Sequence, residues 1–201
     1  MLEWKRQLVI DALAKRGIDA AVQPTIGSGP GGRRRVTLSV RSEHGSVRTG
    51  FNAAHSHDIV EISECPVASQ ILVSAFPVIR ELARLLKVTR EGGHIALTQT
   101  DNGLDVSFSG FEKLDDALRR KLSDFALRKT FARLSVGEDI IVEPVRPSVD
   151  FGGVAVSPPP GGFLQASAHI EAAMADLVTT HIGKAKKTAD QLKDTFQKGK
   201  E

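Results

Sequence analysis

Alternation of apolar and polar residues predicts a strand over 33–41, where Val36, Leu38 and Val40 form the buried face. The odd-numbered positions of this strand are polar and fall on its other face. Farther along, Asn102-Gly103 lies between two such runs and favours a hairpin, because this pair accepts positive φ at low cost. Short apolar runs bounded by turns predict further strands over 47–52, 58–63, 94–100, 104–109, 131–136 and 139–145.

Apolar residues at helical spacing predict helices over 2–16, 68–87, 115–129 and 167–182. Pro77 lies inside the second of these and is expected to split it, because proline lacks a backbone donor and crowds the preceding turn. The order of elements shows no strand–helix–strand alternation and no internal repeat. The predicted fold class is α+β, with antiparallel hairpins and helices packed on them.

Composition shifts along the chain predict three regions. Residues 1–150 form the central α+β domain, and the proline-rich 151–183 forms an extended connector with one helix. Residues 184–201 are rich in lysine and weakly patterned, so we expect a poorly ordered tail. The last helix carries an apolar stripe that we expect to pack on a further domain, or otherwise to fold back, self-associate or fray: Ile170, Met174, Leu177, Val178 and Ile182.

Composition narrows the class of protein. The 201 residues are 41% hydrophobic and 25% charged, which excludes disorder over the whole chain. No apolar run is long enough to cross a bilayer, so no membrane partner is expected. Cys65 is the single cysteine, and no secretory signal opens the chain, which indicates a cytoplasmic location. The net charge of +3 and a pI near 9.1 permit nucleic-acid binding without requiring it.

The densest basic feature is Arg33-Arg34-Arg35, with Arg41 and Arg48 on the same predicted hairpin. Guanidinium groups at alternate strand positions repeat about every 7 Å, which is close to the phosphate spacing of a nucleic-acid strand. These five arginines are therefore candidate RNA-binding residues. The alternative is a solvated sheet face whose charge discourages aggregation.

Other chemical motifs are weak. The run 27–32 has the spacing G-x-G-x-x-G, but a strand follows it where a dinucleotide site requires a helix. His55 and His57 lack the further ligands that zinc needs. Cys65 lies between a strand and a helix, where a helix N-terminus would favour a thiolate, although a small buried residue is the alternative.

Several short segments match one enzyme family in order and spacing: 2–7, 33–39, 50–51, 59–62, 65–66, 159–167 and 188–190. Together, over roughly residues 2–190, they resemble the S-adenosylmethionine-dependent RNA (uracil-5-)-methyltransferases, which make 5-methyluridine in ribosomal and transfer RNA. The resemblance implies RNA as partner and S-adenosylmethionine and a [4Fe-4S] cluster as cofactors of the family.

The resemblance also assigns expected roles to single residues. Cys65 corresponds to one of four cluster ligands, and the other three belong to a segment upstream of the match. Gln165 corresponds to a glutamine that lines the cofactor and target-base site, and Phe163 is the candidate for packing against an extruded uracil. The catalytic thiolate and base of the family belong to a later segment. We therefore expect this chain to bind neither cofactor stably and to be inactive alone.

Three hypotheses follow. The first is a portion of an RNA 5-methyluridine methyltransferase that retains RNA-contacting surface. The second is a non-catalytic RNA-binding or interaction module derived from such an enzyme, with the lysine-rich end as a binding tail. The third is a domain without any nucleic-acid role, but it leaves the ordered set of matching segments unexplained.

Overall fold

The computed structural model describes residues 1–43, 45–129 and 131–198, with side-chain environments up to residue 183. The helices are α1 (Leu2–Ala14), α2 (Gln70–Ala83), α3 (Asp116–Arg128) and α4 (Ala168–Lys198). The longer strands are β1 (Arg35–Glu43), β2 (Ser46–Asn52), β4 (Gly93–Thr100), β5 (Gly103–Ser109), β6 (Phe131–Val136) and β7 (Asp139–Val142). The two-residue strands are β3 (Ile59–Val60), β8 (Val149–Asp150) and β9 (Ala155–Val156).

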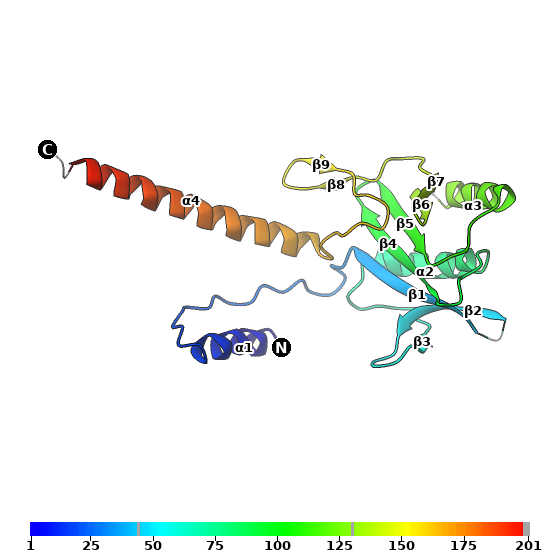
Figure 1. The fold of residues 1–201 in the computed structure, drawn as a ribbon, viewed down its shortest axis with the longest axis horizontal. Coiled ribbons are helices and arrows are strands. Elements are labelled where there is room, and N and C mark those ends of the chain that lie inside the picture. The colour runs from blue at the N-terminus through cyan, green and yellow to red at the C-terminus, as the bar shows by residue number, and fades with distance from the viewer. Residues whose placement is uncertain (44, 130, 199–201) are drawn as a thin grey trace. The chain divides into compact units, whose positions relative to one another are not determined.

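Gly29–Ala168 forms one compact unit, built on a seven-stranded sheet with the order β3-β2-β1-β4-β5-β6-β7 (Figure 1). Every neighbouring pair is antiparallel except β5 and β6. The predicted α+β class with antiparallel hairpins is confirmed.

The expectation that no strand–helix–strand unit occurs is wrong at one junction. Strands β5 and β6 pair in parallel, and α3 makes the crossover between them. The 13 residues of α3 span about 20 Å at ~1.5 Å per residue, which is close to the length of β5. The helix therefore returns the chain to the starting end of β5, and a parallel pair results.

One face of the sheet is apolar. Val36, Leu38 and Val40 of β1 lie in a single core with residues of both α2 and α3. Leu72 and Ile79 of α2 are fully buried there. Burial of their apolar faces against the sheet stabilises both helices, which explains why they form where the amphipathic pattern predicts them.

The opposite face of the sheet is polar, although much of it is buried. In register across four strands lie Arg35, Thr98, Asp105 and Arg133. All except Arg35 belong to the buried polar residues of the unit. The segment that follows β7 contacts this end of the polar face, as the next subsection describes.

The structure corrects several predicted element boundaries. Helix α2 continues through Pro77, because Leu72 and Ile79 on either side of the proline are buried in the same core. This packing outweighs the local cost of the missing N–H, and Pro77 itself lies on the exposed side. Strand β3 covers only Ile59–Val60 of the predicted 58–63, and the small hairpin of β8 and β9 was not predicted.

The other unit consists of Met1–Ser28 together with the chain from His169 onward. Helix α1 has no buried residue, and α4 is longer than predicted, reaching Lys198 instead of residue 182. The side chains from 184 on lie outside the described residues, so the poorly ordered lysine-rich tail stays a prediction. Within the part of the chain that the structure describes, no helix has the length and apolar content of a membrane span.

Candidate functional site

The three consecutive arginines have different environments. Arg33 is exposed, and its Nε donates to the carbonyl of Arg35 at 3.0 Å. The Nε of Arg34 donates to the carbonyl of Gln165 at 3.1 Å, and its backbone N–H donates to Ala166 at 2.7 Å. Arg33 therefore faces solvent, whereas Arg34 anchors the distant segment that contains Gln165.

Arg35 also anchors that segment. Its Nη2 donates to the carbonyl of Gly161 at 3.2 Å. Gly161 has a φ of 64°, and a Cβ added there would lie 3.0 Å from the hydroxyl oxygen of Ser107 on β5. Glycine is thus required both by the backbone conformation and by the close approach to the sheet. We call residues 159–166, which Arg34 and Arg35 hold against the polar face, the anchored loop.

The anchored loop presents one large apolar side chain to solvent. Phe163 is 81% exposed, whereas its neighbour Leu164 is only 5% exposed. Gln165 is half-buried, and its carbonyl oxygen accepts the Arg34 hydrogen bond. The structure therefore brings Arg34, Arg35, Phe163 and Gln165 together at one place, with the aromatic ring directed away from the core.

Arg41 and Arg48 lie farther along the same sheet face, directly opposite each other on β1 and β2. Arg48 forms a salt bridge of 3.3 Å with Glu43, and its side chain is 41% exposed. Both arginines are half-buried, while Thr37 and His94 on this face are exposed. This part of the polar face is a second basic surface, separate from the anchored loop.

A buried ion-pair network was missed by the sequence analysis. Arg133 donates to both carboxylate oxygens of Asp105, through Nε at 2.9 Å and Nη2 at 2.7 Å. It also pairs with Glu143 at 3.4 Å and donates to the carbonyl of Pro158 at 2.8 Å. Side chains of both Arg133 and Asp105 are only 4% exposed. The network therefore fixes the start of the anchored loop to the sheet.

The environment of Arg133 keeps it charged. Burial lowers the pKa of its guanidinium, but the hydrogen bond and charge of Asp105 and the charge of Glu143 outweigh burial. The pKa of Arg133 consequently lies above its ordinary value. The only sign of this ion pair in the sequence is that Asp105 and Arg133 carry opposite charges on two predicted strands. That sign could not show that β5 and β6 are neighbours in the sheet.

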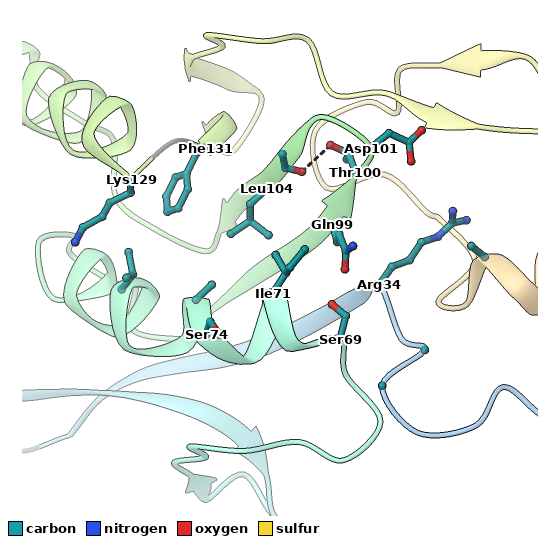
Figure 2. A pocket seen from close by; sticks show the side chains of 16 residues that line it. Arg34, Ser69, Ile71, Ser74, Gln99, Thr100, Asp101, Leu104, Lys129 and Phe131 are labelled. Carbon is teal, nitrogen blue, oxygen red and sulfur yellow. Dashed lines mark hydrogen bonds between the residues drawn. The ribbon is translucent and has the colours of Figure 1, made fainter.

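A pocket of about 710 Å³ lies between the start of α2, the β4–β5 hairpin and the segment joining α3 to β6 (Figure 2). We call it the α2 pocket. Its wall includes Arg34 and Lys129, the polar residues Ser69 and Gln99, and apolar side chains of all three segments. Of the candidate RNA-binding, cofactor-binding and metal-ligating residues predicted from the sequence, Arg34 alone is among the residues that line this pocket.

Cys65 is half-buried and packs against the core. It lines a smaller cavity of about 260 Å³ with Arg33, Arg35 and Phe51. Among the described residues no group of three or more His, Cys, Asp or Glu side chains could hold a metal ion. One thiol does not fit a four-ligand cluster, so the described residues do not form a [4Fe-4S] site by themselves.

The same test applies to S-adenosylmethionine. Gln165 does not line the cavities of about 710, 260 and 330 Å³ in the described part of the chain. A cofactor of this size needs a concave site that buries most of its surface. The described surroundings of Gln165 therefore do not fit S-adenosylmethionine without further protein.

Comparison with known proteins finds relatives along most of the chain. An uncharacterized RNA methyltransferase of Brucella suis is 44% identical over 187 residues, and one of Rhizobium meliloti is 44% identical over 188 residues. Both alignments cover 93% of this chain and 45% of the relative, so the chain spans about half the length of these proteins. A 23S rRNA uracil-C5-methyltransferase of Aeromonas hydrophila is 28% identical over 179 residues, covering 85% of this chain and 41% of that protein. No protein-family model matches the sequence.

Proposed function

Because the chain belongs to the RNA methyltransferase family that these relatives represent, we propose that it supplies RNA-contacting surface to an RNA 5-methyluridine methyltransferase. The substrate is ribosomal or transfer RNA, and the parent reaction transfers a methyl group to C5 of uracil. The similarity to a 23S rRNA uracil-C5-methyltransferase supports this choice of base and atom.

The anchored loop is the observation that carries the proposal. The ring of Phe163 is 81% exposed, and two arginine anchors hold the loop that carries it, so it presents an aromatic face to solvent on a fixed support. Exposed aromatic faces on rigid supports stack on unpaired bases. Gln165 follows two residues later in the same loop. In the longer parent enzyme, where further protein completes the S-adenosylmethionine site, Gln165 would lie beside the stacked base.

We propose further that the 201-residue chain alone does not transfer methyl groups. Uracil C5 becomes nucleophilic only after a thiolate adds to C6, and a base must then remove the C5 proton. Cys65 is the single cysteine of the chain, and it is half-buried and packs against the core. A cytoplasmic location, inferred from the single cysteine, belongs to the same proposal.

A binding measurement tests the role of Phe163. We expect Phe163→Ala to weaken the binding of single-stranded RNA by about tenfold, since base–aromatic stacking contributes ~1–3 kcal/mol. Fluorescence anisotropy at fixed salt provides the dissociation constants. Phe151→Ala is the matched control, because Phe151 is also exposed, at 41%, but lies outside the anchored loop. Equal affinities of both variants and the wild type would refute the stacking role.

A further inference from the structure

The α2 pocket contains two polar atoms that lack partners among the described residues. The hydroxyl oxygen of Ser69 and the Oε1 of Gln99 are both buried and form no hydrogen bond there. Ser69 is the N-cap of α2, yet its side chain makes no capping hydrogen bond. Figure 2 shows the two side chains pointing toward one another, one from the N-cap of α2 and the other from β4. Folded proteins rarely leave such atoms unpaired, so a bound group with donors and acceptors at its edge would find partners here.

The apolar wall of the pocket suits a planar, largely apolar group. Ile71 of α2, Leu104 of β5 and Phe131 of β6 all line it. Figure 2 shows Ile71 and Leu104 close to Gln99, so an apolar surface adjoins the unpaired amide oxygen. A nucleobase has this combination, because its faces are apolar and stack on side chains while its edge carries N–H donors.

Charge at the pocket favours one nucleotide of a strand over a free polyphosphate. Arg34 and Lys129 lie at opposite ends of the pocket in Figure 2, and each supplies a positive charge where a phosphate could pass. Asp101 also lines the pocket, and its carboxylate repels a cluster of phosphates. The same carboxylate can accept a hydrogen bond from a ribose 2′-hydroxyl, which RNA carries and DNA lacks.

We propose that the α2 pocket binds a single unpaired nucleotide of an RNA strand, with an N–H of its base donating to Gln99 Oε1. The Ser69 hydroxyl forms the second hydrogen bond to the base edge, and the strand enters and leaves past Arg34 and Lys129. The site is distinct from Phe163, so the RNA is held at two separate unpaired positions. This inference rests on the proposed function, since it presupposes that the chain contacts RNA.

Substitution of the unpaired groups tests the site with the full 201-residue chain. Gln99→Leu and Ser69→Ala each remove a buried unpaired atom, so we expect the melting temperature of the free protein to stay equal or rise. Each substitution should nevertheless weaken the binding of an oligonucleotide of about 12 unpaired nucleotides by about fivefold. Gln23→Leu is the matched control, because Gln23 is exposed and does not line the pocket.

The probes are labelled single-stranded RNAs of mixed sequence, the same backbone with abasic residues, and free adenosine and uridine monophosphates. We expect the wild type to prefer base-bearing RNA over abasic RNA and Gln99→Leu to reduce that preference, with the dependence on salt unchanged. Displacement of the RNA by a mononucleotide at equal affinity would overturn the assignment to a strand.

The outcomes separate this inference from the proposed function. If RNA binds the wild type and both pocket variants equally well, the pocket assignment fails while the RNA-contacting role stands. If none of the RNAs binds the wild-type chain, the pocket assignment fails together with the proposed function.

Discussion

At the scale of single residues, the arginines of this chain divide into anchors and exposed contacts. Arg34 and Arg35 donate to backbone carbonyls of the anchored loop, whereas Arg33 is exposed. A guanidinium that is fixed by a carbonyl still carries its charge, so anchoring does not remove it from the RNA-facing surface. Their first contribution is nevertheless to hold Phe163 and Gln165 in place.

Loss of an anchor should make the loop accessible to proteases. We expect Arg34→Gln to speed cleavage by chymotrypsin after Phe163 by about tenfold, because a hydrogen bond from a charged donor contributes ~1.5–3 kcal/mol. Cleavage follows the population of the open loop when opening and closing are fast. Mass spectrometry of timed digests identifies the cut. Arg41→Gln, which removes an arginine remote from the loop, should leave the rate unchanged, and equal rates in both variants would contradict the anchoring role.

Arg133 is the residue on which the buried network depends. We expect Arg133→Met to lower the free energy of unfolding by about 3–5 kcal/mol, because Asp105 is left buried without its partner. Adding Asp105→Leu should recover most of this loss. Arg119→Gln is the control, since the Arg119–Asp139 pair is partly exposed and contributes less than about 1 kcal/mol. Urea denaturation measures all four proteins.

The raised pKa of Arg133 fixes the sign of its pH dependence. A basic group whose pKa is higher in the folded state stabilises the fold at every pH below its ordinary pKa, and loses that effect only in strong alkali. The difference in stability between the wild type and the double variant Arg133→Met, Asp105→Leu, which leaves no buried carboxylate unpaired, should therefore be the same at about pH 6 and about pH 9. A loss that differs between these two conditions would show that another group titrates with the network.

At the scale of elements, local signals predicted most helices and hairpins. The Asn102-Gly103 turn joins β4 and β5 as expected, and α3 begins and ends within about two residues of its predicted bounds. Strand pairing over long sequence distances was not predictable in this way. The parallel pairing of β5 with β6 depends on how α3 packs, and no residue of either strand encodes it locally.

At Pro77, core packing keeps α2 continuous although proline disfavours the interior of a helix. A substitution at this position tests that explanation. We expect Pro77→Ala to stabilise the protein by about 1–2 kcal/mol, because alanine restores the missing helix hydrogen bond at an exposed position. The greater freedom of the unfolded alanine chain offsets part of this gain. Glu81→Ala, at an exposed position of the same helix, should change stability by less than about 0.5 kcal/mol. A destabilised Pro77→Ala variant would show that the proline is required by the shape of α2.

At the scale of the whole molecule, sequence comparison and structure contribute different parts of the account. The matching segments indicated the family, and relatives covering 93% of the chain support it. Nothing in the pattern of residues indicated the α2 pocket, because it is assembled from segments that are distant along the chain. The role of Arg34 as an anchor was hidden for the same reason, since its partner is 131 positions away.

The central claim is that this chain binds RNA and that the arginines on the polar face of its sheet contact the phosphates, and the salt dependence of binding tests it most directly. The logarithm of the binding constant should fall linearly with that of the salt concentration, with a slope of about −0.7 for each phosphate contact to single-stranded RNA. Arg41→Gln combined with Arg48→Gln should make this slope shallower by about 1.4.

The matched control is Arg119→Gln with Arg120→Gln, on α3, which covers the other face of the sheet. The account predicts that this control keeps the wild-type slope. Equal slopes in all three proteins, or no binding of RNA by the wild-type chain, would contradict it.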